Sequence, residues 1–282
     1  MATSLPTFAL DSSLFNQTLY AELHDLWFSG IPDGAESASF PVVQRWFGAG
    51  WSDEQKAAFN AKCKEVAGPA LESIGPSKIT LPPFVSYENE IEHAGTLAAP
   101  FLDEVDQAQQ HSDKQGADTL LSMILLLDQM PRNIFRKREE LPLVYNHYDR
   151  LGFALARSSL ATRRDLVEHP SLMKRYFWCW RLIPLMHAEH LPSHKFALET
   201  DDRWKQMAPE PTEGPAVQFA KGNLEAWDDH EEPLRLFGRY PHRNECLGRQ
   251  NTPEETEYLK TAKTFGVEQS NKKGDTVPKE EL

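Results

Sequence analysis

Three short segments of this 282-residue chain carry side chains that could exchange protons with a substrate or bind an anion. In the first, Asp128 lies four residues after Ile124, so on a helix its carboxylate shares the apolar, core-facing stripe. Pro131 disfavours the helical conformation at the residue before it, and proline suits the first position of a new helix. The sequence therefore predicts a junction between two helices, with Arg132 and Asn133 near Asp128. Two interpretations stay open: an Asp–Arg pair that locks two helices together, or a ligand site.

The second segment is a run of aromatic and aliphatic residues that ends in a histidine. His187 lies four residues after Ile183 and seven after Trp180, so its imidazole points along an apolar helix face. Pro184 should kink or interrupt this helix, because it removes one backbone hydrogen bond and leaves a carbonyl free. A buried histidine beside a kink is typical of a pocket, and a histidine satisfied within the core is the plainer alternative.

The spacing of His187, His190 and His194 also permits a metal site, since the first two could share a helix face. Pro192 disrupts that face before His194, and neutral histidines alone do not define a metal. We therefore expect neither a metal nor a cofactor.

The third segment, 237–245, combines a fixed backbone with a block of polar side chains. His242 could act as an acid or a base, Arg243 could bind a carboxylate or phosphate with its forked donors, and Asn244 could orient a carbonyl group. The alternative is a capped helix start whose polar groups bond to neighbouring loops. The sequence lacks GxSxG, GxxxxGK[ST], GxGxxG and HExxH motifs, which favours acid–base chemistry over a covalent or nucleotide mechanism.

Helical periodicity dominates the elements that must position these side chains, and period-two alternation is almost absent. The first helix is expected to begin at Ser12 or Ser13 and the second at Ser52 or Asp53. The other predicted helices span about 115–129, 143–160, 172–187, 219–236 and 252–262, with long connections at 75–83 and 209–215. The pattern predicts one all-α domain over 11–265, a loose N-terminus at 1–10 and a disordered C-terminal tail at 266–282.

The composition, with 40% hydrophobic and 26% charged residues, is that of an ordinary globular protein. Its formal net charge of −12 disfavours nucleic acid and anionic membrane surfaces as partners. We see no secretory leader and no run of about 18 apolar residues, and the three cysteines form no CxxC pair. The expected location is the cytoplasm, and the sequence does not indicate an oligomeric state.

At the three segments the chain resembles the bacterial and fungal family called domain of unknown function 924, of the tetratricopeptide-like all-helical superfamily. The matching motifs read LLLDQMPRNIFR at 125–136, PLMHAE at 184–189 and GRYPHRNECLGRQNTPEE at 238–255. The resemblance covers roughly Leu23 to Phe265 and implies a superhelical array of antiparallel helices. It also implies one polar site made of Asp128, Gln129, Arg132, Asn133, His187, Glu189, His242, Arg243 and Asn244.

The sequence departs from the bacterial pattern of this family in three places. Lys137–Pro142 replaces a different turn, and His190 stands where an acidic residue is usual, which weakens the metal interpretation. The stretch Gly75–Ala99 is longer than in bacterial relatives and could cover a pocket.

These observations favour a small-molecule enzyme of the hydrolase or lyase/cyclase type. Asp128 and either His187 or His242 would exchange protons, while Arg132 or Arg243 binds an anionic or carbonyl-containing substrate. The alternative is a tetratricopeptide-like peptide-binding or scaffold module without catalysis, which should show a long open groove rather than a closed pocket. We expect the three segments to meet at one cavity.

Overall fold

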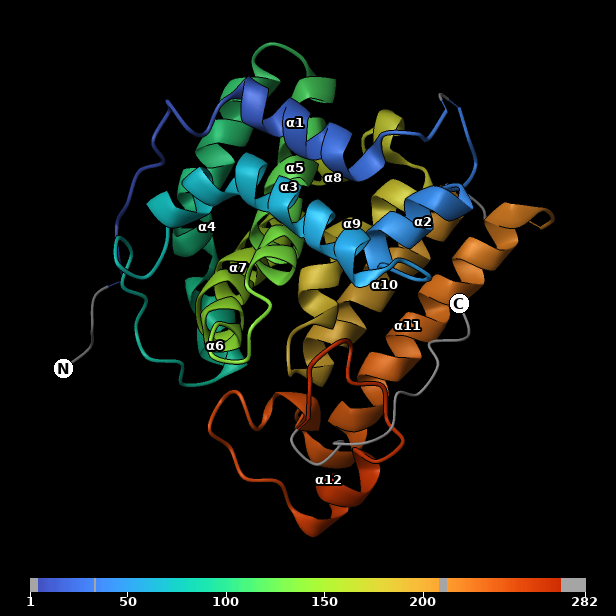
Figure 1. The fold of residues 1–282 in the computed structure, drawn as a ribbon. Coiled ribbons are helices and arrows are strands. Elements are labelled where there is room, and N and C mark those ends of the chain that lie inside the picture. Colours follow the sequence, from blue (N-terminus) through green and yellow to red (C-terminus); the bar gives the residue numbers. More distant parts are fainter. Residues whose placement is uncertain (1–4, 33, 208–211, 270–282) are drawn as a thin grey trace.

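The computed structural model describes residues 5–32, 34–207 and 212–269, and all of its regular elements are helices (Figure 1). The α-helices are α1 Gln17–Phe28, α2 Phe40–Phe47, α3 Asp53–Ser73, α4 Tyr87–Gln109, α5 Asp113–Ile134, α6 Leu141–Leu143, α7 Asp149–Thr162, α8 Arg164–Val167, α9 Arg175–Met186, α10 Leu191–Met207, α11 Pro215–Phe237 and α12 Pro253–Tyr258. A π-helical turn, η1, spans Val144–Tyr148, and 3-10 turns η2 and η3 span Pro170–Leu172 and Pro241–Arg243. The prediction of an all-α fold is confirmed.

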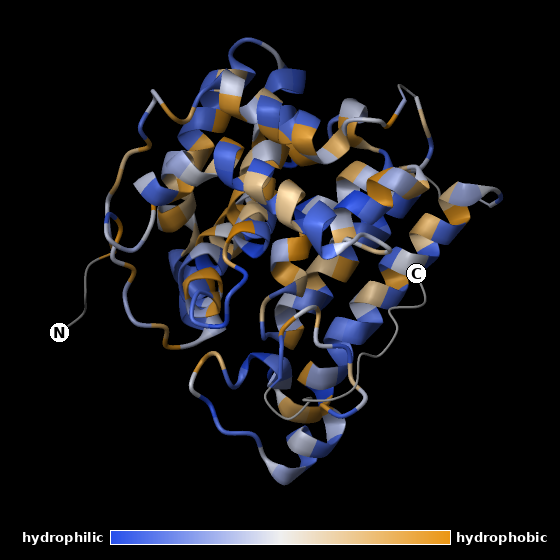
Figure 2. Cartoon of the chain, viewed as in Figure 1, coloured by the Kyte–Doolittle hydropathy of each residue, from blue (hydrophilic) through white to orange (hydrophobic). Residues whose placement is uncertain are grey.

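Helix α5 is the centre of the fold, because it contacts α1, α3, α4, α7, α8 and α9. From Leu120 to Asp128 every side chain of this helix is buried, as expected of a helix that is apolar on all its faces. Figure 2 shows hydrophobic residues gathered where the helices meet and hydrophilic residues on the outer turns. The hairpin of α4 and α5 is consistent with the tetratricopeptide-like array that the family resemblance implies.

The expected helix junction at Pro131 is wrong. Pro131 lies inside α5, which continues to Ile134 before Phe135 ends it. A proline in the last turn removes only one hydrogen bond, so burial of the helix outweighs its cost. Arg132 and Asn133 therefore belong to the same helix as Asp128 and lie one turn or so beyond it.

The helix starts follow local capping rules. Ser52 caps α3 as predicted, with Gln55 completing a reciprocal capping box. The first helix begins later than predicted, because Asn16 rather than Ser12 or Ser13 accepts the free backbone N–H groups of α1. Helices α2, α4 and α10 have no counterpart among the predicted ranges.

The helix predicted over 143–160 contains an irregularity that bears on the site. Residues 141–162 form one continuous helical run in which η1 widens the turn before α7. Tyr145 lies within the wide turn and Asp149 begins α7. Single π-turns inside α-helices occur frequently at functional sites, because the extra residue re-aims the side chains around it.

The C-terminal part attaches below the helical body in Figure 1, after Gly238 ends α11 in the left-handed conformation. It is mainly hydrophilic in Figure 2. The ion pair of Arg249 with Glu189 joins it to the helical body, and that of Arg239 with Glu255 lies within it. The segment then returns so that Phe265 lies over the rings of His230 and His242.

One continuous cluster of buried apolar side chains runs from Phe15 to Trp227. The predicted domain limits of 11 and 265 stay predictions, and residues 1–4, 208–211 and 270–282 lie outside the described residues. Within the part of the chain that is described, no helix combines the length and apolar character that crossing a bilayer requires.

Candidate functional site

A buried carboxylate and an imidazole from different helices form the centre of the candidate site. Asp128 on α5 is 1% exposed, and its Oδ1 lies 2.8 Å from Nδ1 of His187, which follows the last residue of α9. When Asp128 is ionised its carboxylate can only accept, which assigns the imidazole proton to Nδ1 and leaves the Nε2 lone pair free. Oδ2 of Asp128 accepts a hydrogen bond from the Gln129 amide at 2.6 Å.

Burial sets the protonation of this pair. Burial lowers the pKa of His187 well below its usual range, and the neighbouring guanidinium of Arg132 lowers it further, so the ring is neutral near pH 7. Burial also raises the pKa of Asp128, while Arg132 and the Gln129 amide oppose that rise by favouring the carboxylate.

Arg132 has a different main partner from the one that its spacing suggests. Its Nη1 and Nη2 donate to Oδ1 and Oδ2 of Asp149 at 2.6 and 2.9 Å, whereas its nearest approach to the Asp128 carboxylate is 3.4 Å. Nη1 also donates to the backbone carbonyl of Asp128 at 2.7 Å. The two-pronged geometry engages both oxygens of Asp149 and ties α5 to α7.

Arg243 lies on the other side of Asp149. Its Nη1 is 3.7 Å from Asp149 Oδ2, which is too far for a hydrogen bond, and the residue is only 6% exposed. The guanidinium lies over the rings of Tyr145 and Tyr240, with its central carbon 4.3 and 4.7 Å from the ring centroids. The Arg243 Nε is buried and has no hydrogen-bond partner among the described residues.

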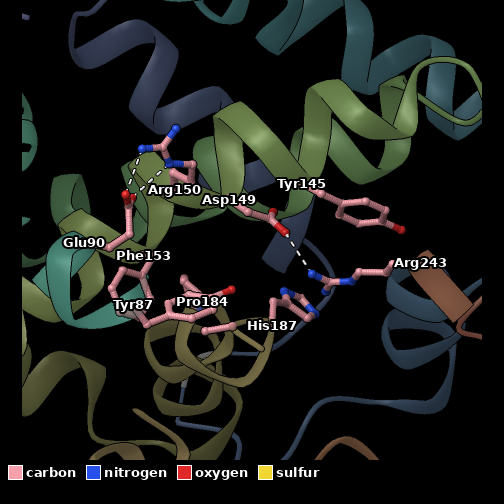
Figure 3. A pocket seen from close by; sticks show the side chains of 10 residues that line it. Tyr87, Glu90, Tyr145, Asp149, Arg150, Phe153, Pro184, His187 and Arg243 are labelled. Atoms are coloured by element: carbon pink, nitrogen blue, oxygen red, sulfur yellow. Dashed lines mark hydrogen bonds and ion pairs between the residues drawn. The ribbon is translucent and has the colours of Figure 1, made fainter. Parts of the chain in front are cut away.

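A pocket opens in front of His187 and Arg243 (Figure 3). Its empty volume, counted out to the open mouth, is about 300 Å³. Lining side chains come from α4, η1, α7, α9 and the C-terminal segment: Tyr87, Glu90, Tyr145, Asp149, Arg150, Phe153, Pro184, His187, Ala188 and Arg243. Asp128 and Arg132 contact the lining residues His187 and Asp149 from behind, so part of the expected convergence is present.

His242 lies in a second layer rather than on the pocket wall. It is 5% exposed, and its ring stacks on Tyr240 with centroids 5.4 Å apart. His230 connects the two layers, since its ring centroid is 5.7 Å from that of His187 and 5.9 Å from that of Tyr240. Burial lowers the pKa of both His230 and His242 well below the usual range, and nearby cationic groups add to the effect.

Three of the nine predicted site residues are engaged in holding the backbone or the C-terminal segment. Glu189 accepts two hydrogen bonds from Arg249 and one from the backbone N–H of Tyr240. Asn244 is fully buried and donates to Asn251 and Glu255.

Asn133 donates to the backbone carbonyl of Gln129, one turn back in α5.

Some lining residues were missed by sequence reasoning. Asp149 and Tyr145 belong to no motif, although both lie within the helix predicted over 143–160. Tyr87 and Glu90 come from the stretch Gly75–Ala99, whose extra length had suggested a cover for a pocket. Glu90 accepts two hydrogen bonds from Arg150, so this buried pair forms a neutral end wall.

The described residues contain no group of three or more His, Cys, Asp or Glu side chains arranged to hold a metal ion. Nδ1 of His190 lies 2.8 Å from the Ser193 hydroxyl, and Nε2 of His194 lies 3.0 Å from the Met186 carbonyl, so both rings are engaged elsewhere. The expectation that no metal is required stays a prediction, which stoichiometric zinc or iron in the purified protein would contradict.

The sequence matches a known family over most of its length. The model described as "Bacterial protein of unknown function (DUF924)" covers residues 23–263. The chain belongs to this family. Within the DUF924 family, the present chain places its stretch Gly75–Ala99 beside the pocket, through Tyr87 and Glu90.

A solved structure is also similar: the protein of unknown function ATU0120 from Agrobacterium tumefaciens shares 23% sequence identity. The similarity covers 86% of this chain and 97% of that one, with a TM-score of 0.49. No curated protein matches this DUF924 chain.

Proposed function

We propose that this protein is a small-molecule enzyme in which His187 exchanges protons with the substrate. The observation that supports the proposal is the hydrogen bond between His187 Nδ1 and Asp128 Oδ1, 2.8 Å long, behind a ring that lines the pocket. A carboxylate at Nδ1 fixes the tautomer and stabilises the imidazolium that forms when Nε2 takes up a proton. Asp128 thus positions and polarises His187 without touching the substrate.

Arg243 would stabilise negative charge on the substrate. Its guanidinium lies on the same wall of the pocket as His187, so negative charge that develops on a substrate oxygen would meet a fixed positive charge in a water-poor site (Figure 3). A neutral imidazole base and a guanidinium together suit hydrolysis, or elimination next to a carbonyl group, hence a hydrolase or lyase.

The proposal includes a cytoplasmic location, a small-molecule substrate and no membrane or nucleic-acid partner. The net charge of −12 supports the exclusion of nucleic acid, because an anionic surface repels the phosphate backbone.

The test is a search for turnover followed by one substitution. The purified protein is incubated with a mixture of small carboxylic acids, esters and hydroxy acids, and mass spectrometry follows which of them are consumed. His187→Gln should lower the rate of any turnover by about 10²- to 10⁴-fold, because the amide cannot accept and return a proton at neutral pH. His111→Gln, at an exposed histidine, is the matched control.

A rate that His187→Gln leaves intact would refute this role of His187. Binding of extended peptides without turnover in the wild-type protein would instead favour a peptide-binding module.

A further inference from the structure

Arg243 has more hydrogen-bond donors than partners. A guanidinium carries five N–H groups, and no side-chain hydrogen bond joins Arg243 to any residue that the structure describes. Its nearest carboxylate, Asp149, already has both oxygens bound by Arg132. Buried polar groups are almost always hydrogen-bonded, so the buried and unpartnered Nε of Arg243 indicates a missing acceptor.

The surroundings of Arg243 determine which direction that acceptor can come from. The rings of Tyr145 and Tyr240 both lie within 5 Å of the guanidinium carbon. Because aromatic rings lie against the guanidinium, an acceptor can approach it only in the plane of the guanidinium. There its parallel N–H groups point outward. Arg243 lines the pocket, and Figure 3 shows its guanidinium directed towards Asp149 and the space beside His187.

The opposite part of the pocket combines apolar side chains with the Glu90–Arg150 pair (Figure 3). Tyr87, Phe153 and Pro184 lie together there, and the rings of Tyr87 and Phe153 meet edge to face with centroids 5.5 Å apart. The Tyr87 hydroxyl accepts a hydrogen bond from the backbone N–H of Glu189 and keeps its own proton to donate. A ligand bound to Arg243 would extend its other end against the rings of Tyr87 and Phe153.

The size of the pocket and the charge of Asp149 restrict the kind of ligand that can bind. The empty volume of about 300 Å³ includes solvent at the open mouth, so it is an upper limit on the space and only a compact ligand fits. The carboxylate of Asp149, 3.7 Å from Arg243 Nη1, repels a dianion about twice as strongly as a monoanion. A planar, singly charged group fits this end of the pocket better than a phosphate.

We propose that the pocket binds a small monocarboxylate with a compact apolar or aromatic body, its carboxylate on the edge of Arg243 and its body against Tyr87 and Phe153. This inference rests on the proposed function in that it specifies the substrate class of the same site. It assigns the binding of the anion to Arg243 and not to Arg132, which is not among the lining residues and binds Asp149.

The experiment measures binding without turnover, by calorimetry and by ligand-observed NMR on the full chain. The probes are benzoate, its uncharged analogue benzamide, acetate as a carboxylate without a body, and inorganic phosphate. Benzoate should bind the wild-type protein more tightly than each of the other three. Its advantage over benzamide should be on the order of 10- to 100-fold, the range for a hydrogen bond to a charged group.

Two matched substitutions locate the contact. Arg243→Met should remove the preference for benzoate over benzamide, whereas Arg235→Met, at an exposed arginine of α11, should preserve it. If Arg243→Met does not fold, the ranking of the four probes on the wild-type protein decides alone. Equal binding of benzoate and benzamide, tighter binding of phosphate, or no binding of any probe would overturn the proposal.

This outcome is separable from that of the proposed function. If no substrate is turned over, the relative affinities of the four probes still test the binding proposal. If the probes bind in another order, the effect of His187→Gln on turnover still tests the catalytic proposal.

Discussion

Arg132 and Asp149 are joined by two hydrogen bonds, of 2.6 and 2.9 Å, that link the end of α5 to the start of α7. The sequence suggested Asp128 as the partner of Arg132, across a junction between two helices. In the structure the Asp128 carboxylate is 3.4 Å from Arg132 and bonds to His187 instead. The two aspartates therefore have separable roles, which substitutions can distinguish.

Asp128→Asn should change stability little and function strongly. The amide keeps the shape of the side chain, and Arg132 keeps both bonds to Asp149, so no guanidinium is left unpaired. The amide can, however, donate to His187 Nδ1 and stabilise the wrong tautomer. Turnover should fall by about 10²-fold or more while the melting temperature stays close to that of wild type. A large drop in the melting temperature would make Asp128 a structural clamp.

Asp149→Asn should destabilise the fold. Among the residues that the structure describes, Asp149 alone binds Arg132 with both carboxylate oxygens, and it also lies beside Arg243. The substitution therefore leaves two largely buried guanidinium groups without this carboxylate. Breaking a buried ion pair from one side costs about 3 to 5 kcal/mol in the free energy of unfolding. Urea denaturation measures the loss, with Asp202→Asn at an exposed position as the control. A loss as small as that of the control would contradict the assigned role.

Stability should fall as the pH is lowered from 6.5 towards 4. Burial holds the pKa values of His187, His230 and His242 well below the usual range and lowers that of His194 to about 4. Below pH 6.5 these histidines become protonated in the unfolded chain but stay neutral in the folded protein. Each therefore lowers the free energy of unfolding by up to about 1.4 kcal/mol per pH unit. The raised pKa of Asp128 acts in the opposite sense.

The substitution His242→Asn isolates one of these contributions. It should reduce the slope of unfolding free energy against pH by up to about 1.4 kcal/mol per unit below pH 6.5. The histidine at 111 is exposed, and its replacement by Asn should leave the slope unchanged. Denaturation at several pH values between 4 and 7 gives both slopes, and equal slopes for wild type and His242→Asn would show that His242 titrates alike in both states.

Phe265→Ala should raise the pKa of His230. The Phe265 ring lies 4.1 Å from the His230 ring, centroid to centroid, and helps to exclude water from it. Since burial is the main cause of the lowered pKa, hydration through the gap moves the value back towards the usual range. The histidine C–H signals in an NMR pH titration report the change. Phe47→Ala, at another exposed phenylalanine, is the control, and an unmoved His230 would mean that Phe265 does not shield it.

The side-chain directions in the C-terminal motif could not be predicted from the sequence. His242, Arg243 and Asn244 are consecutive, yet only Arg243 reaches the pocket wall. His242 stacks on Tyr240, and Asn244 bonds to Asn251 and Glu255. In a 3-10 turn successive side chains point in different directions, so adjacency in sequence does not bring all three to one site.

The sequence by itself determined the all-α class and the placing of Asp128 and His187 on apolar helix faces, because helical periodicity is a local property. The tertiary structure decided which groups meet. The pairing of Arg132 with Asp149 depends on how α5 packs against α7, and the bond between Asp128 and His187 depends on how α9 ends beside α5. Such contacts depend on packing between helices that are distant in sequence, which the spacing of residues within one helix does not specify.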